Sequence, residues 1–401
     1  MPPKHTVHKN HRWLILLILF LTIIVAFIGR LSTSVALENI GHELVWSHAQ
    51  KGYLGGVLMG IFLVSYGFSN VFFSPNIDRY GSKIVLVFSL VGSSLAVFIG
   101  AIFGHIYSAF LLSRLLLGLS QGVMFPVASK VIAGWFTVET RGKANSIFIT
   151  GASVGVALAP LIMGPVMLQY GWRASFYLVA IIGFFLTVPI AFFIKDSSEE
   201  NMVYNRDIDV KQAFKKMLGE KEFKQITVGF TAVNTMWWGA TLWVPTFLEE
   251  MHGLNIGVTP YLASIPYLGA IAGLFTGTWI SDMRGNRNTV IMFSLFMTGV
   301  MFMVLAFTPV AGLYMAVALL VLLFFFGQLA PPLFFTKLQN TMDGNQLGSA
   351  TGLMNGIANI FGVVGPVSVG IVVAITGSYS LGLLSLTAVA FGGLIGFKSL
   401  I

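Results

Sequence analysis

Two arginines lie inside hydrophobic stretches of this chain, where an arginine is suited to bind an anion. Arg30 stands seventeen residues into the first stretch, and Arg114 lies within the fourth. A guanidinium in hydrocarbon costs about 2.5–3.5 kcal/mol on insertion scales, so each side chain is expected to face a polar interior and find a partner there. No Asp or Glu occurs in the middle of any hydrophobic stretch. Because a guanidinium fork pairs with a carboxylate through two parallel hydrogen bonds, the unpaired charge predicts an anionic ligand.

Both arginines also have a structural interpretation, in which the side chain extends to the membrane surface or braces neighbouring helices. This alternative is stronger for Arg114, which lies nearer the end of its hydrophobic stretch. There it could influence a bound anion only through its electric field. Partners inside the protein could be backbone carbonyls, water, Tyr66 or Gln121. Arg30 is therefore the principal candidate for the anion ligand.

The elements that must position these arginines follow from the composition. Apolar residues make up 56% of the 401 residues, charged residues only 9%, and the mean hydropathy is +0.84, far outside the range of soluble proteins. The predicted fold class is an all-α integral membrane protein in a lipid bilayer. Segments of about 20 residues, long enough to cross the hydrocarbon, can be placed twelve times. They are residues 13–37, 52–73, 83–103, 107–133, 144–168, 175–194, 226–248, 259–281, 289–307, 313–335, 349–375 and 380–397.

Positive charge sets the orientation of these spans. If the amino terminus is cytoplasmic, only Lys51 and Arg173 of the 23 Lys and Arg residues fall outside the cell, apart from the two arginines within spans. The positive-inside rule then places both termini in the cytoplasm, and we expect a multi-pass protein of the inner membrane. The net charge of +8 is mostly an orientation signal and predicts no nucleic-acid partner. A cleaved signal peptide over residues 1–36 fits poorly, because the apolar run is too long for one.

A polar interval divides the spans into two groups of six. We expect a first six-helix bundle in residues 1–195, a cytoplasmic linker in residues 196–224 and a second six-helix bundle in residues 225–401. Segment 210–223 of the linker has apolar residues at helical spacing and could form an amphipathic helix along the membrane. A solvated linker without such a helix is the simpler alternative.

The two groups of spans repeat one another. Asp78 recurs as Asp282 at an offset of 204 residues, and Gln121 recurs as Gln328 at an offset of 207. Several further residues recur at offsets of 204 to 207, in the matching span or loop of the other group. A parallel repeat of this kind predicts two bundles that enclose a site near the midplane and expose it alternately to each side.

Several motifs resemble the major facilitator superfamily. Residues 78–83, with the sequence DRYGSK, are similar to the short cytoplasmic loop motif of that superfamily, although Ser74 replaces its leading glycine. More narrowly, other stretches resemble the anion:cation symporter branch, whose members take up sugar acids and other organic anions. Those stretches are residues 60–66, 114–121 with 125–126, 171–173, 243–248 and 350–356.

This resemblance implies a secondary transporter that moves a small organic anion, a carboxylate or sugar acid, by alternating access, with import favoured over export. It places gates in the two repeated loops, at Asp78, Arg79, Asp282 and Arg284. A ligand held between two bundles needs contacts from both, so polar and aromatic residues of both groups are candidates. The expected substrate-binding residues are Arg30, Tyr66, Arg114, Gln121, Asn234, Trp238, Tyr267, Gln328, Asn355 and Asn359.

Some of these candidates keep an alternative role. The asparagines could join helices by hydrogen bonds without touching a ligand, since Asn355 and Asn359 share a helix face. Trp238 could belong to an aromatic belt at the membrane surface.

Two positions depart from the pattern of the branch, in which an acidic residue commonly precedes the first arginine and another follows the second by seven residues. This chain has Gly29 and Gln121 there, and neither takes up a proton near neutral pH. We therefore do not expect proton coupling through a carboxylate in mid-membrane. Glu38, at the outer end of the first span, is the remaining candidate for such a site, and uniport, anion exchange and coupling to a cation stay open.

Other functions agree less well with these residues. A multidrug or metabolite exporter shares this architecture, but cationic drugs would require a buried acid. A carrier of a zwitterionic, amino acid-like substrate and a sensor that binds without transport are further alternatives. The G-x-S-x-G pattern at residues 118–122 lies within a span, not on a strand-to-helix turn, so no enzyme is expected.

The absence of Cys excludes thiolate metal sites, and no metal or cofactor is expected. The expected partners are an anionic small molecule and the lipid bilayer, with a coupling ion as an open alternative, and the carrier is expected to be a monomer.

Overall fold

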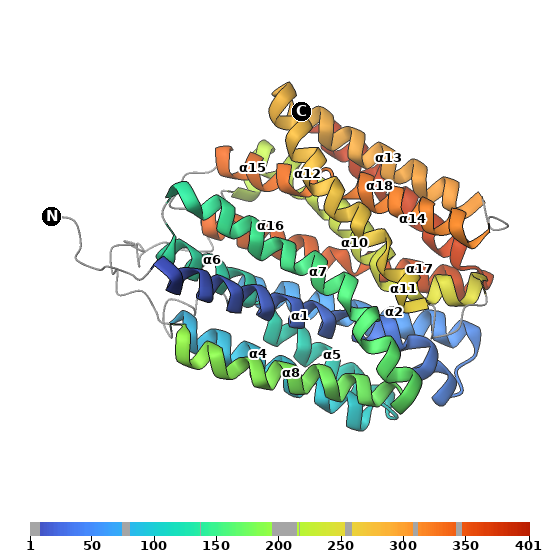
Figure 1. The fold of residues 1–401 in the computed structure, drawn as a ribbon. Helices are drawn as coiled ribbons and strands as arrows, with labels where there is room; N and C mark the ends of the chain where they lie inside the picture. Colours follow the sequence, from blue (N-terminus) through green and yellow to red (C-terminus); the bar gives the residue numbers. More distant parts are fainter. Residues whose placement is uncertain are drawn as a thin grey trace.

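The structure, a computed structural model, describes residues 9–73, 81–136, 138–194, 215, 217–252, 259–307, 312–341 and 347–401. The regular structure of these residues is entirely α-helical, and most helices run along a common direction (Figure 1). The predicted gate residues Asp78 and Arg79 lie outside the described residues, as do residues 210–214 and 216 of the predicted amphipathic helix at 210–223. The side chain of Asp282 is also outside the described part.

Each predicted span that the structure describes is helical, because a backbone surrounded by hydrocarbon must satisfy its hydrogen bonds within its own segment. We call the helices before the polar interval the first half and those after it the second half. The first half comprises α1 (Lys9–Glu43), α2 (His48–Phe72), α4 (Ser82–Phe103), α5 (Tyr107–Gln121), α6 (Met124–Trp135), α7 (Val138–Tyr170) and α8 (Trp172–Phe193). The second half comprises α10 (Lys221–His252), α11 (Thr259–Ser264), α12 (Pro266–Arg284), α13 (Arg287–Phe307), α14 (Leu313–Gly327), α15 (Pro331–Thr341), α16 (Leu347–Gly362), α17 (Val364–Thr376) and α18 (Tyr379–Ser399).

Eleven helical segments within the described residues are long and apolar enough to cross a membrane. They coincide with eleven of the twelve predicted spans, so the predicted all-α membrane fold is confirmed at this level. The remaining predicted span, 226–248, forms the 32-residue helix α10. This helix is long enough to cross, but Asn234, Trp237 and several threonines make it less apolar than the others. A twelfth crossing therefore remains a prediction.

Four predicted spans are interrupted rather than continuous. The fourth span consists of α5 and α6, the eighth of α11 and α12, the tenth of α14 and α15, and the eleventh of α16 and α17. The first of these breaks follows Gln121 and the third falls at Gln328, two residues that the repeat relates. Prolines account for the break at Gln328, since Pro331 and Pro332 cannot donate the backbone hydrogen bonds that would continue α14.

Helices pack against one another both within each half and between the two halves. Within the first half, α1 packs on α7 and α8, α2 on α5, and α4 on α5 and α8; within the second half, α10 packs on α16, α17 and α18, and α13 packs on α14 and α18. Between the halves, α2 packs along α16 and α17, α7 packs against α11 and α12, and α1 contacts α10. The buried surface between the halves is thus formed chiefly by α1, α2 and α7 on one side.

The start of α1 and the end of α18 lie at one end of the molecule, which we call the termini end (Figure 1). The start of α10 lies at this end as well, because Gln225 donates a hydrogen bond to the carbonyl of Phe397 in α18 over 3.2 Å. The opposite end, which we call the Lys51 end, contains the connection between α1 and α2 and the end of α10. There α2 approaches α17 so closely that a Cβ on Gly52 would lie 2.7 Å from the carbonyl oxygen of Gly370. Only glycine allows this approach at position 52.

Candidate anion-binding site

Arg30 lies in the middle of α1 and is buried, with 5% of its surface exposed. Three aromatic rings surround its guanidinium. The carbon Cζ is 4.1 Å from the ring centre of Phe27, 4.5 Å from that of Tyr66 and 5.4 Å from that of Phe62. Phe27 precedes Arg30 by three residues on the same helix face, and the other two rings come from α2. Cation–π attraction therefore holds the charge in place without neutralising it.

The hydrogen bonds of Arg30 leave part of its guanidinium unused. Nε donates to Oε1 of Gln121 over 2.7 Å, and Nε2 of Gln121 donates to the carbonyl of Ala26 over 3.2 Å. Nη2 is buried and has no hydrogen-bond partner in the described chain. Because Gln121 is neutral, it orients the guanidinium but leaves its full positive charge available to a ligand.

The second half reaches this site through Trp238 of α10. The ring of Trp238 lies 6.1 Å from that of Phe27 and 6.4 Å from that of Phe62. Trp238 is itself buried, with 3% of its surface exposed, so it lies inside the protein rather than in a belt at the membrane surface. The rings around Arg30 therefore lie at the contact between the two halves.

Four asparagines form a chain of amide contacts between the halves. Nδ2 of Asn355 lies 3.4 Å from Oδ1 of Asn70, Nδ2 of Asn359 donates to Oδ1 of Asn355 over 3.1 Å, and Nδ2 of Asn234 lies 3.5 Å from Oδ1 of Asn359. Asn70 also donates to the carbonyl of Tyr66 over 3.2 Å, which places one end of the chain beside the Arg30 site. The predicted residues Asn234, Asn355 and Asn359 are thus brought together.

Asn70 is a member of this chain of amides that the sequence patterns did not single out. It comes four residues after Tyr66, so both lie on one face of α2, and this spacing was the available signal.

Arg114 is placed differently from Arg30. Its Nη1 donates to Oγ of Ser32 over 3.0 Å and lies 3.4 Å from the carbonyl oxygen of Gly29. The rings that it faces belong to Phe110 of α5 and Phe176 of α8. All these contacts belong to the first half. The structure therefore brings Arg114 close to the backbone beside Arg30 but gives it no described contact with the second half.

Two further predicted residues lie in the second half, away from the aromatic rings that surround Arg30. Tyr267 packs against Trp237 and Phe324, and its hydroxyl lies 3.4 Å from the carbonyl oxygen of Thr241. That carbonyl is free because Pro245, four residues later in α10, has no N–H to donate to it. Gln328 is buried at the break between α14 and α15.

A charged cluster at the Lys51 end was not foreseen from the sequence. Nζ of Lys51 donates to Oε1 of Glu38 over 2.6 Å and to Oε1 of Glu250, so α1, α2 and α10 meet at one ammonium group. The side chain of Lys51 is largely buried, with 10% exposed. His42 and His48 also approach these carboxylates, at 3.3 Å from Glu38 and 3.8 Å from Glu250. The position of Glu38 in the first span was predicted, but a sequence does not show which charges from distant spans meet.

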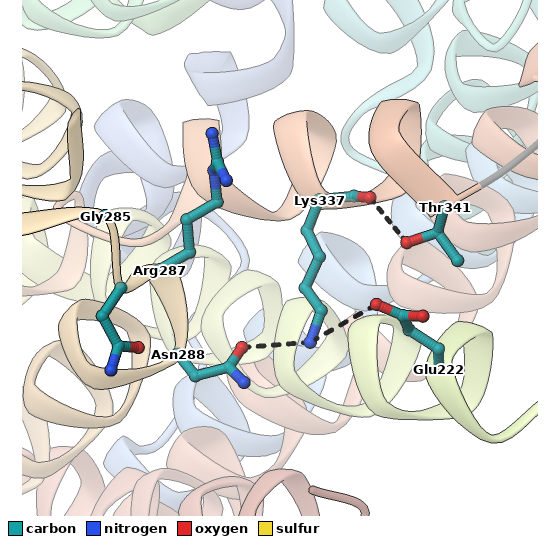
Figure 2. Close-up of a pocket in the computed structure, with 7 residues that line it drawn as sticks. Glu222, Gly285, Arg287, Asn288, Lys337 and Thr341 are labelled. Atoms are coloured by element: carbon teal, nitrogen blue, oxygen red, sulfur yellow. Dashed lines mark hydrogen bonds and ion pairs between the residues drawn. The ribbon is translucent and has the colours of Figure 1, made fainter.

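At the termini end, Arg284 is exposed in the last turn of α12, just before Gly285, which has a φ of 65°. Close by is a polar pocket of about 510 Å³ between α10, α13 and α15, shown in Figure 2. In this pocket Lys337 donates to Asn288 over 3.0 Å and to Gln225, and it lies 4.0 Å from Glu222. Since oxygens of this chain already surround the ammonium group, we assign no ligand to the pocket.

Comparisons with known proteins find one family profile and several relatives. The family profile described as Major Facilitator Superfamily matches residues 19–366. The chain is 29% identical to the hexuronate transporter of Bacillus subtilis, over 91% of this chain and 89% of the relative. It is 27% identical to the probable galactarate/D-glucarate transporter GarP of Escherichia coli, over 92% of this chain and 90% of the relative.

Among solved structures, a bacterial homologue of the human lysosomal transporter Spinster superposes with a TM-score of 0.78 and 16% identity, covering 98% of this chain and 97% of that one. This likeness concerns the fold alone.

Proposed function

This chain belongs to the Major Facilitator Superfamily, and from that premise we propose that it carries a sugar-acid anion across the membrane by alternating access. It is a multi-pass membrane transporter rather than an enzyme. Hexuronate and galactarate/D-glucarate, which the names of the two relatives mention, define the substrate class that we propose for it. We further propose that it works as an importer, with twelve spans and with both termini in the cytoplasm.

The observation that carries this proposal is the unneutralised guanidinium of Arg30. It is buried at the contact between the halves, it is held by a neutral amide, and its Nη2 has no partner in the described chain. A carboxylate that reaches Nη2 gains a charge-assisted hydrogen bond in surroundings from which water is largely excluded. We therefore assign Arg30 as the carboxylate ligand, with Tyr66 and Gln121 as the residues that orient it.

The chain of asparagines supports a polyhydroxylated substrate. An amide offers both donors and an acceptor, so it can bind hydroxyl groups of either orientation. In the present arrangement the four amides of Asn70, Asn234, Asn355 and Asn359 satisfy one another or backbone carbonyls. Two of these contacts are 3.4 Å or longer, which is a weak hydrogen bond that a sugar hydroxyl can replace at little cost. The carboxylate would thus bind to the first half, and the hydroxyls chiefly to Asn234, Asn355 and Asn359 of the second half.

Alternating access requires the two halves to separate at each end in turn. We propose that residues 1–195 and 225–401 are the two moving bundles and that residues 196–224 link them. The contacts of Lys51 with Glu250 and of Gly52 with Gly370 would close the Lys51 end. The gates at Asp78, Arg79, Asp282 and Arg284 would act at the termini end.

Uptake of an anion by this carrier requires a source of energy. Driving one anionic charge into a negative cell costs about 2.3 kcal/mol per 100 mV, so uptake by uniport is unfavourable. No described carboxylate lies in contact with Arg30, which argues against a proton site of that kind in mid-membrane. We therefore propose exchange against another anion, or coupling to a cation that binds elsewhere.

Uptake into proteoliposomes tests the function directly. Labelled glucuronate, galactarate and D-glucarate are offered with the pH gradient, sodium gradient and membrane voltage set separately. We expect saturable uptake of at least one of them, and a loss of more than tenfold in Arg30→Gln. Lys398→Gln, which removes an exposed positive charge at the end of α18, is the matched control for charge. Equal uptake by the parent protein and Arg30→Gln would refute Arg30 as the ligand, and no uptake of any sugar acid would refute the substrate class.

A further inference from the structure

Positive charge is distributed unequally between the two sides of the candidate anion-binding site. The first half supplies Arg30, which is buried at the contact between the halves. Residues 225–401 contain four Lys and Arg residues in total, and all of them lie at the termini end: Arg284, Arg287, Lys337 and Lys398. Lys337 contacts Gln225, which precedes Trp238 by thirteen residues, or about 20 Å along α10. The second half therefore brings no lysine or arginine to the surroundings of Arg30.

The polar groups that the second half does bring to the site are neutral amides. Nδ2 of Asn234 donates to the carbonyl of Ala358 over 2.9 Å, and Nδ2 of Asn359 donates to the carbonyl of Asn355 over 2.8 Å. The donors of these amides are thus in use, and their oxygens lie beside them. A hydroxyl group both donates and accepts, so it can join such a chain. A carboxylate only accepts, and the amide and carbonyl oxygens would repel it.

Arg30 can neutralise one carboxylate. Its Nε is bound to Gln121, whereas its Nη2 has no partner in the described chain. The rings of Phe27, Phe62 and Tyr66 lie within 5.4 Å of its Cζ. A carboxylate bound at Nη2 balances the single positive charge of this site. A second carboxylate on the same ligand would then find no charge left to pair with.

Two other buried cations of the described chain are not free to serve as the second partner. Arg114 has 1% of its surface exposed, and its hydrogen bonds go to Ser32 and Gly29 of α1. Lys51 lies at the Lys51 end, where the carboxylates of Glu38 and Glu250 already neutralise it. The described part of the site therefore offers one unneutralised cation to a ligand.

We propose that this site selects sugar acids with one carboxylate, uronates and aldonates, over aldarates, which carry a carboxylate at each end. This inference rests on the proposed function and narrows its substrate class. Arg30 binds the one carboxylate, and the amides of Asn234, Asn355 and Asn359 bind the uncharged remainder. The second carboxylate of an aldarate would lose its hydration and gain no cation, so it weakens binding. The three asparagines thus determine specificity because they carry no charge.

Isothermal titration calorimetry on the detergent-purified protein at pH 7, where carboxylates are ionised, tests this selectivity. D-Gluconate, D-glucuronate and D-glucarate share their hydroxyl stereochemistry and differ at the ends of the carbon chain. The Kd of D-glucarate should exceed that of the tighter monocarboxylate by about tenfold or more. The monoamide of D-glucarate, which keeps the size but has one charge, should bind within about threefold of that monocarboxylate. The corresponding galactose-derived acids are measured in the same way.

A variant at Asn355 tests the role of the amides. Asn355→Lys places a cation on the face that approaches Asn70, and it should lower the Kd of D-glucarate relative to D-glucuronate by about tenfold. Asn355→Gln, which keeps a neutral amide, is the matched control and should leave this ratio unchanged. If Asn355→Lys fails to fold, the series of ligands on the parent protein still decides the matter.

An aldarate that binds as tightly as the monocarboxylates of its series would overturn the inference and leave the proposed function in place. Loss of that tight binding in Arg114→Gln would then assign Arg114 as the second cation. Weak binding of the monoamide as well would show that size and not charge excludes the aldarate. A folded Asn355→Lys protein with an unchanged ratio would contradict the role of Asn355. Binding of no sugar acid in either series would refute the proposed function itself, and this inference with it.

Discussion

Lys51 of α2 donates a hydrogen bond to Glu250 of α10, and this ion pair joins the first half of the protein to the second. The same ammonium group binds Glu38 of α1, which fixes it within the first half. An exposed ion pair usually contributes little, but Lys51 is largely buried and holds two carboxylates from different helices. Removing Lys51 would leave both carboxylates close together without a cation, so the pair is expected to bias the Lys51 end toward closure.

We expect Lys51→Gln to open the Lys51 end. The chain has no Cys, so spin labels can be attached to cysteines introduced at Val45 and Ile375, exposed residues of the two halves at this end. Double electron–electron resonance should show a longer mean distance between the labels in Lys51→Gln than in the parent protein. Arg173→Gln is the control, because Arg173 pairs with Glu43 within the first half. An unchanged distance distribution would mean that the ion pair does not hold the halves together.

Gln121→Glu should make substrate binding dependent on pH. A carboxylate in place of the amide would lie at hydrogen-bond distance from Nε of Arg30, where Oε1 of Gln121 now lies at 2.7 Å, and would neutralise the guanidinium. The KM for the sugar acid should then rise at least tenfold near pH 7.5. It should fall again only near and below the ordinary pKa of a glutamate, about 4.3, because the neighbouring guanidinium favours the charged carboxylate and protonation is needed to release the charge of Arg30.

Uptake kinetics between about pH 4 and 8 measure this effect, with the parent protein as the control. A KM that is high and independent of pH would show that the carboxylate only disturbs packing. A KM equal to that of the parent would show that Arg30 does not bind the substrate through its charge.

Asn355→Ala separates recognition of hydroxyl groups from bracing between helices. If Asn355 binds a hydroxyl, its loss should weaken binding of hydroxylated acids by about 0.5–1.5 kcal/mol, or roughly 2–12-fold in KM. Inhibition of uptake by an acid without hydroxyl groups, such as hexanoate, should be unchanged. Asn288→Ala, in the pocket at the termini end, is the matched control. Equal losses for both classes of acid would favour a bracing role.

Gly52→Ala should impair transport without removing the binding residues. A methyl group there would lie 2.7 Å from the carbonyl oxygen of Gly370, too close for α2 and α17 to keep their present approach. We expect uptake to fall at least tenfold while equilibrium binding in detergent changes less than threefold. Gly392→Ala, whose Cβ would meet nothing within 4 Å, serves as the control. Normal uptake by Gly52→Ala would show that this approach is not needed in the transport cycle.

Sequence patterns predicted the helices well because hydrocarbon leaves a buried backbone few alternatives to helix. Predicted and observed bounds of the second span, 52–73 against His48–Phe72, differ by four residues at most. The break between α11 and α12 was not predicted, since Pro266 alone marks it and proline is common inside spans such as α7. A break depends on packing with neighbouring helices, which hydropathy does not report.

For the candidate site, side-chain types were more predictable than their partners. The burial of Arg30 and its contact with Gln121 follow from charges and polar groups placed at the same depth. The direction of Arg114 could not be predicted, because depth along a helix does not specify which face turns toward the other half. The sequence places Lys51 outside the cell but does not show its partner, because Glu250 is 199 residues away along the chain.

The breaks at Gln121 and Gln328 occur at equivalent points of the repeat, so the fourth and tenth spans each consist of two helices joined at a break in the backbone hydrogen bonding. Bending at such a point disturbs fewer backbone hydrogen bonds than bending a continuous helix. The segments α6 and α15 can therefore change their tilt while α5 and α14 keep theirs. Conformational change at the termini end therefore does not require movement of whole bundles. A change in the tilt of α6 in the first half and of α15 in the second half would leave the side chains around Arg30 in place.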